Sequence, residues 1–178
     1  MLVMGIFNVT PDSFADGGRH NDFEAAVEHG LEMIAEGVDI IYIGGESTRP
    51  GAERVSETEE IARTIPVIKE LSKHRVTISI DTMRASTAEA AIKAGASIIN
   101  DVSGGLADVA MLQTAAQLQV PYIAMHWRGH AKEMNSKAIY GDVVVDVISE
   151  LNERIEAALD VGIHRNKLII DPGIGFAK

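Results

Sequence analysis

Residues 40–51 read Ile-Ile-Tyr-Ile-Gly-Gly-Glu-Ser-Thr-Arg-Pro-Gly, an apolar run followed directly by a polar, glycine-containing segment. A near-continuous apolar run is typical of a strand that is buried on both faces of a parallel sheet. The segment from Gly44 reads as a long loop, and loops carry function more often than packing. The stretch therefore predicts a parallel strand whose carboxyl end opens into a functional loop.

The same unit recurs along the chain. Apolar runs predict strands at residues 2–7, 40–43, 76–80, 97–99, 121–125 and 167–170. Amphipathic or Ala-rich segments predict helices at residues 21–37, 56–71, 86–95, 107–118 and 143–161. Ser56 with Glu59 and Ser86 with Glu89 have the spacing of capping boxes, and Asn21 is placed to cap the first helix.

Strict alternation of strands and helices predicts a parallel sheet, either doubly wound or closed as a (β/α)8 TIM barrel. No G-x-G-x-x-G motif follows the first strand and no Walker A motif occurs, which counts against a nucleotide-binding doubly wound sheet. A ring of polar groups from many strand ends is typical of the carboxyl face of a barrel. These strand ends are Asn8, the loop from Gly44 to Arg49, Asp81, Asn100, His126 and Asp171.

We therefore predict an α/β barrel fold, of which residues 1–178 supply one partial domain with about the first six strand-helix units. A whole barrel has eight units and usually ~250 residues, so the chain stops short of closure. Such an open barrel would expose the edges of its first and sixth strands.

Composition narrows the class of protein. The net charge is -10, from 26 acidic and 16 basic residues, and no Lys/Arg-rich run occurs. This argues against a nucleic-acid or anionic-membrane partner. The absence of cysteine excludes disulfides and fits a cytoplasmic location. Met1 to Phe7 lacks a basic leader and is too short for a signal peptide or a membrane span, so we expect a buried strand there.

Residues 8–18, from Asn8 to Gly18, form a second polar loop after a strand. It holds an amide, two hydroxyls and two carboxylates, although a solvated surface loop is an equally good interpretation of this stretch alone. His126 could point into a pocket or be a hydrogen-bonded core residue, whereas His20, His74 and His130 read as surface residues. No histidine pair lies at i, i+4 on a predicted helix and no cysteine occurs, which counts against a zinc site. The role of the loop from Trp127 to Tyr140 stays open.

Taken together, several motifs resemble those of the dihydropteroate synthases, in order from the first residues of the chain to the last. Two departures are mild: Ala15 stands where serine is usual, and Ala177 where glycine is common. The matching segments are residues 8–18, 44–52, 79–82, 100–104, 125–126 and 171–176.

The resemblance implies a (β/α)8 barrel that condenses 6-hydroxymethyl-7,8-dihydropterin diphosphate with 4-aminobenzoate and releases pyrophosphate, using Mg²⁺. It implies that Asp81, Asn100 and Asp171 bind the pterin, whose edge of N–H and NH₂ donors needs acceptors in a pocket. The alternative for each residue is a helix cap or a turn-stabilising side chain.

The resemblance also assigns the remaining site residues. Asn8 would bind the metal, with Asp12 or Asp16 able to add a carboxylate when the first loop closes. Phe14, Pro50 and Phe176 would shape the aminobenzoate pocket. The catalytic set would be Asn8, Asp12, Ser13, Thr48 and Arg49.

In that family, strands seven and eight bring a serine, a lysine, an arginine and a histidine to the site, and these lie outside the 178 residues. We therefore expect little activity from this chain alone, and a homodimer when it is full length. Two alternatives stay open: a folate-binding methyltransferase of the same barrel type, and an inactive pterin-binding paralogue.

Overall fold

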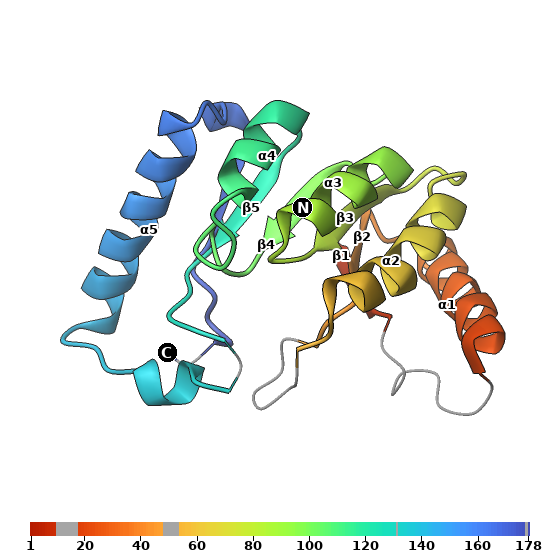
Figure 1. Cartoon of the computed structure of the whole chain (residues 1–178), viewed down its shortest axis with the longest axis horizontal. Coiled ribbons are helices and arrows are strands. Elements are labelled where there is room, and N and C mark those ends of the chain that lie inside the picture. Colours follow the sequence, from red (N-terminus) through yellow and green to blue (C-terminus); the bar gives the residue numbers. More distant parts are fainter. Residues whose placement is uncertain (10–17, 48–53, 131, 177) are drawn as a thin grey trace.

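The computed structural model describes residues 1–9, 18–47, 54–130, 132–176 and 178. In this part of the chain strands and helices alternate, as the sequence predicts (Figure 1). The strands are β1 (Met4–Asn8), β2 (Ile40–Gly44), β3 (Thr77–Asp81), β4 (Ile98–Asp101), β5 (Tyr122–Met125) and β6 (Leu168–Asp171). The α-helices are α1 (Gly18–Ala35), α2 (Glu57–Leu71), α3 (Ala85–Ala94), α4 (Met111–Leu118) and α5 (Val143–Asp160). Short 3-10 helices span Met134–Lys137 and Arg165–Lys167.

The six strands form one sheet in the order β1-β2-β3-β4-β5-β6, and every neighbouring pair is parallel. Strand order that follows the chain order is the order of a barrel, whereas a doubly wound sheet reverses direction at a switch point. The helices follow one another around one side of the sheet, each packing on the next (Figure 1). The structure therefore favours the barrel over the doubly wound alternative.

Side chains alternate between the two faces of each strand. The helix-facing set is apolar and forms the buried core, with α1 adding the predicted stripe of Phe23, Val27, Leu31 and Ile34. Members of this set from the strands are Phe7, Ile41, Ile43, Ile78, Ile80, Ile99, Tyr122 and Ala124. The residues between them lie on the opposite face of the sheet, which would line the barrel interior. We call this face the concave face.

The two outer strands leave part of this concave face exposed. Within the described residues β1 pairs only with β2, and β6 only with β5, as expected for an open barrel. Ile6 is 68% exposed and Ile169 is 48% exposed, each opposite the helix-facing residues of its strand. The prediction that residues 1–7 form a buried strand is therefore wrong in part, because β1 is an edge strand and Phe7 alone is buried in it.

Helix starts depart from the predictions in three places. Asn21 does not cap α1, because that helix already begins at Gly18. The Ser86–Glu89 capping box is wrong, because α3 begins at Ala85 and the Oδ2 atom of Asp108 accepts the Ala85 N–H at 2.8 Å. The helix predicted from residue 107 begins at Met111 instead, since Asp108 also accepts the N–H of Ala110 in a turn.

The start of α2 agrees with the prediction. The Ser56 hydroxyl accepts the Glu59 N–H at 3.2 Å, so Ser56 is the N-cap. The Glu59 side chain pairs with Arg63 at 2.9 Å. This cap fixes where the chain enters α2 after the second polar loop.

We predict that Ser56→Ala lowers the free energy of unfolding by about 1 kcal/mol, the usual cost of losing an N-cap hydroxyl. Ser86→Ala is the matched control, because Ser86 is an exposed residue inside α3 and should change stability by less than about 0.5 kcal/mol. Urea unfolding of both variants measures this. Equal effects at the two positions would contradict the assigned caps.

Candidate active site

The carboxyl ends of four neighbouring strands bring the predicted binding residues onto the concave face. Asn8 of β1 is paired in register with Gly44 of β2, and Gly44 with Asp81 of β3. Asp81 is in turn paired with Asn100 of β4. Positions in register on parallel strands point to the same face, so the parallel pairing alone places these residues side by side.

Gly44 leaves the space that its neighbours need. A Cβ atom at this position would lie 3.2 Å from the Oδ1 atom of Asn8 and 3.3 Å from the Oδ2 atom of Asp81. Both oxygens therefore face the same small volume above Gly44. The glycine after the β2 apolar run is thus part of the site and not merely a loop residue.

Asp81, Asn100 and Tyr42 make up a hydrogen-bonded group. The Asn100 amide nitrogen donates to the Asp81 Oδ1 atom at 3.1 Å and to the Tyr42 hydroxyl at 3.3 Å. Asp81 and Asn100 are buried, at 5% and 7% exposure. Their partners are each other and Tyr42, so these hydrogen bonds are neither helix caps nor turn contacts.

The turn-stabilising role falls on the next residue in the chain. Asp101 accepts hydrogen bonds from the Ser103 N–H and the Ser103 hydroxyl, at 2.8 and 2.7 Å, from the Gly105 N–H at 2.7 Å, and from the Tyr122 hydroxyl at 2.8 Å. It is fully buried on the helix side. Asp101 therefore stabilises the loop after β4 and leaves Asn100 available to a ligand.

Asp171 stabilises a turn and also stands at a strand end on the concave face. Its Oδ1 atom accepts the Gly173 N–H at 2.7 Å, in a turn where Gly173 has a φ of 63°. The backbone carbonyl of Asp171 accepts the His126 N–H at 2.9 Å. Asp171 therefore does stabilise a turn, which was the alternative interpretation. The turn uses only its Oδ1 atom and does not need the other carboxylate oxygen.

Burial changes the acid-base behaviour of this group. Removal from water raises the pKa of Asp81 to about 7, although its hydrogen bonds to Tyr42 and Asn100 act in the opposite direction. Nearby carboxylates, those of Asp101 and Glu60, raise it further. Burial, followed by the charge of Asp81, raises the pKa of Tyr42 far above its ordinary value, so the phenol keeps its proton.

The shift predicts a pH-dependent stability. Between about pH 4, the ordinary carboxyl value, and about pH 7, folded Asp81 holds a proton that the unfolded chain has lost. The free energy of unfolding should therefore fall as pH rises through this window. Asp81→Asn should remove this dependence and be more stable than the wild type by a few kcal/mol at about pH 8.

Urea unfolding between about pH 4 and pH 8 measures this difference. Glu156→Gln is the control, because Glu156 is an exposed carboxylate on α5 and its replacement should leave the pH dependence as it is. A stability difference for Asp81→Asn that is equal at all pH values would show that Asp81 titrates normally.

A second charged cluster, which the sequence analysis missed, joins β2, α2 and the start of α3. The Arg84 guanidinium donates to Glu46 at 3.1 Å, to the Val55 carbonyl at 2.6 Å, and to Glu60. The Glu60 side chain is 1% exposed, the Glu46 side chain 9% and the Arg84 side chain 16%. Glu46 also accepts from Arg54 at 3.0 Å, so the cluster ties together the chain on both sides of residues 48–53.

Sequence patterns gave little sign of this cluster, because Glu46, Glu60 and Arg84 lie 14 to 38 positions apart along the chain. We predict that Arg84→Met lowers the free energy of unfolding by about 3 to 5 kcal/mol, because it leaves the buried Glu60 carboxylate without its cation and Glu46 with the more exposed Arg54 alone. Arg54→Met removes a more exposed partner of the same Glu46, with 39% side-chain exposure, and should cost at most about 1 kcal/mol. Chemical unfolding measures the stability of the two variants. If both lose the same free energy of unfolding, Arg84 does not have the central role assigned to it.

His126 is a hydrogen-bonded, buried residue, one of the two roles the sequence left open. It is 2% exposed and its Nε2 atom lies 2.9 Å from Glu150 on α5. Burial lowers the pKa of the imidazole. His74 is exposed as predicted, but His130 is partly buried against Trp127, so the surface prediction for it is wrong.

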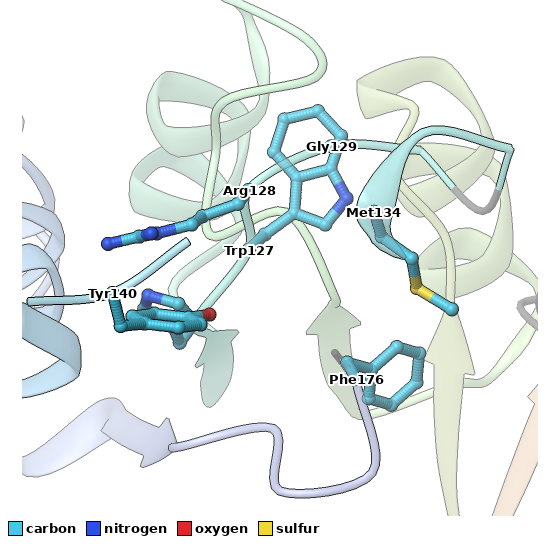
Figure 2. Close-up of a pocket in the computed structure, with 7 residues that line it drawn as sticks. Trp127, Arg128, Gly129, Met134, Tyr140 and Phe176 are labelled. Atoms are coloured by element: carbon cyan, nitrogen blue, oxygen red, sulfur yellow. The ribbon is translucent and has the colours of Figure 1, made fainter. Parts of the chain in front are cut away.

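The loop after β5 builds a small pocket with the end of the chain (Figure 2). The Arg128 guanidinium lies 3.9 Å from the centre of the Tyr140 ring and also pairs with Glu150. Phe176 and Met134 lie on the other side of this pocket (Figure 2). Phe176, a predicted aminobenzoate residue, is thus partly buried beside the loop from Trp127 to Tyr140.

The other predicted site residues lie outside the described residues. They are Asp12, Ser13, Phe14, Asp16, Thr48, Arg49 and Pro50. Their predicted roles therefore stay predictions. In the part of the chain that the structure describes, no group of three or more His, Asp or Glu side chains could hold a metal, and no helix is long and apolar enough to cross a membrane.

Comparison with known proteins shows the family and the fold of this chain. Residues 4–178 match the family described as pterin binding enzyme. A dihydropteroate synthase of Bacillus subtilis is 52% identical over 178 residues, which cover 99% of this chain and 60% of that protein. Among solved structures, Xanthomonas albilineans dihydropteroate synthase with 4-aminobenzoic acid has a TM-score of 0.90 at 48% identity, covering 99% of this chain and 63% of that one.

A second solved structure, the Xanthomonas albilineans enzyme in complex with 7,8-dihydropteroate, has a TM-score of 0.84 at 44% identity, with coverage of 99% and 62%. The likeness extends over nearly the whole of this chain. Its six strand-helix units are therefore those of a TIM barrel of this type, and the chain spans about 60% of the length of the curated relatives it matches.

Proposed function

The chain belongs to the family of pterin binding enzymes, and from that premise we propose that the protein is a dihydropteroate synthase. It joins 6-hydroxymethyl-7,8-dihydropterin diphosphate to the amino group of 4-aminobenzoate and releases pyrophosphate. The observation that carries this proposal is the set of acceptors on the concave face. Asp81 and Asn100 are buried there beside each other, with Asp171 two strands away.

The pterin edge explains why these residue types suit the site. It carries N–H and NH₂ donors, which lose water when the ring enters a pocket and then need acceptors. The carboxylates of Asp81 and Asp171 and the amide oxygen of Asn100 supply them. The diphosphate would lie towards the strand ends of β1 and β2, where the two polar loops begin.

Mg²⁺ fits this end of the site. The Asn8 side-chain oxygen lies at the end of β1, 3.2 Å from the point where a Cβ atom of Gly44 would stand, and magnesium favours hard oxygen ligands, taking few from the protein and the rest from phosphate and water. When bound, the ion neutralises charge on the departing diphosphate. Asn8 would hold it, and Asp12 or Asp16 would add a carboxylate.

The protein then has to position the amine and keep water out. The bond from the pterin methylene to the diphosphate breaks early, because the electron-rich ring stabilises the positive charge. Ser13, Thr48 and Arg49 would contact the diphosphate side, and negative charge that develops there is stabilised by such donors. Phe14, Pro50 and Phe176 would hold the aminobenzoate ring and exclude water from the cation.

We further propose that the reaction takes place in the cytoplasm, which the absence of cysteine supports. The acidic composition supports small-molecule substrates and no nucleic-acid or membrane partner. A homodimer of the complete protein is proposed from its family membership.

The test uses the product of the complete reading frame that encodes this chain. We predict pyrophosphate release that requires both substrates and Mg²⁺ and that EDTA abolishes. Asp81→Asn should raise the KM for the pterin diphosphate about ten- to hundredfold, because an ionic acceptor is lost, and leave the KM for 4-aminobenzoate within about twofold. Glu156→Gln, on the exposed face of α5, is the control.

Pterin binding without pyrophosphate release would refute the synthase and point instead to a binding module. Methyl transfer from a folate, without any need for a diphosphate, would point to the related methyltransferases.

A further inference from the structure

Tyr42 lies among the predicted pterin residues, although no sequence motif singled it out. Its neighbours Ile41 and Ile43 are fully buried against the helices, so alternation along β2 points Tyr42 to the concave face. Its register partner on β3 is Ser79, two residues before Asp81. The phenol is long enough to extend from this lower level of the sheet to the level of Asp81 and Asn100.

A hydrogen bond shows that it does so. The Tyr42 hydroxyl accepts from the Asn100 amide nitrogen at 3.3 Å. Burial, followed by the charges of Asp81 and Asp171, raises the pKa of this phenol. The hydroxyl thus contacts Asn100 directly and lies within electrostatic reach of the other two proposed pterin residues.

Counting donors shows what the hydroxyl does for Asn100. The amide nitrogen has two hydrogens, and it makes two hydrogen bonds, to the Asp81 Oδ1 atom and to Tyr42. Both donors are therefore used inside the protein. A flipped amide would place its oxygen against the Asp81 carboxylate, which is unfavourable, so the amide oxygen of Asn100 remains for a ligand.

The same count applies to Asp81. Its Oδ1 atom accepts from Asn100, while its Oδ2 atom lies against Gly44, 3.3 Å from the point where a Cβ atom would stand. The Asn100 amide, which is itself held by the Tyr42 hydroxyl, fixes the orientation of the carboxylate. Above about pH 7, where Asp81 is ionised, the group offers a ligand acceptors only, which is the complement of a row of N–H donors.

We propose that Tyr42 is a positioning residue of the pterin site, whose hydroxyl holds the Asn100 amide, and through it the Asp81 carboxylate, with the Asn100 oxygen towards the pterin. This inference rests on the proposed function, since it names a residue of the same site. Tyr42 acts through Asp81 and Asn100 and not on the reacting atoms. Its hydroxyl should therefore affect the affinity for the pterin and leave the chemical step nearly unchanged.

The experiment compares Tyr42→Phe with the wild type in the product of the complete reading frame. The substitution removes one oxygen and keeps the ring, so the fold is retained. We expect the KM for the pterin diphosphate to rise about five- to thirtyfold, the effect of a hydrogen bond to a buried charged pair. We expect kcat, and the KM for 4-aminobenzoate, to stay within about twofold.

Ser79→Ala is the matched control. It removes a hydroxyl from the register partner of Tyr42, and the buried Ser79 Oγ atom has no hydrogen-bond partner among the described residues. Loss of this hydroxyl should leave all three kinetic constants within about twofold. A rise in the pterin KM for Tyr42→Phe alone supports the inference, whereas equal effects of the two variants, or none, would overturn it.

A titration with 6-hydroxymethylpterin separates this inference from the proposed function. Its Kd should rise by the same factor in Tyr42→Phe as the pterin KM, and the thermal unfolding midpoint should change by less than about 2 °C. If the wild type binds the pterin but releases no pyrophosphate, the synthase proposal fails and the titration still decides the role of Tyr42. If the wild type binds no pterin, both proposals fail.

Discussion

The alternation of side chains along parallel strands is the constraint on which the rest of this structure depends. In β2 and β3 it sends Ile41, Ile43, Ile78 and Ile80 to the helices and leaves the intervening residues for the concave face. The parallel register then sets the strand ends beside one another. One periodicity therefore supplies both the apolar contact that stabilises the sheet and the polar row that forms the site.

Burial of this polar row has a cost that the structure offsets locally. A carboxylate removed from water is unfavourable unless it is hydrogen-bonded, and the Asp81 carboxylate is bonded to Asn100 and Tyr42. Its raised pKa shows that this compensation is incomplete. A ligand that brings N–H donors to this carboxylate completes its hydrogen bonding and stabilises its charged form. The cost of the buried charge in the free site therefore favours binding of an N–H-rich ring.

Much of the fold and part of the candidate site could be predicted from the sequence. Apolar runs located the six strands of the described residues, because most helix-facing residues are apolar. The polar strand ends pointed to Asp81 and Asn100, which lie side by side on β3 and β4, and to Asp171 at the end of β6. Tyr42 was missed because an aromatic residue inside an apolar run reads as core. The Arg84 cluster and the Asp108 cap were missed because each joins residues that are distant in sequence and meet only in the folded chain.

The central claim is that the concave face presents acceptors to a ligand edge made of donors. The most direct test is to compare the affinities of 6-hydroxymethylpterin and 6-hydroxymethyllumazine, in which a carbonyl replaces the 2-amino group and turns a donor into an acceptor. We expect the lumazine to bind at least about a hundredfold more weakly, because its oxygen would face the carboxylates. Equal affinities for the two compounds would contradict it.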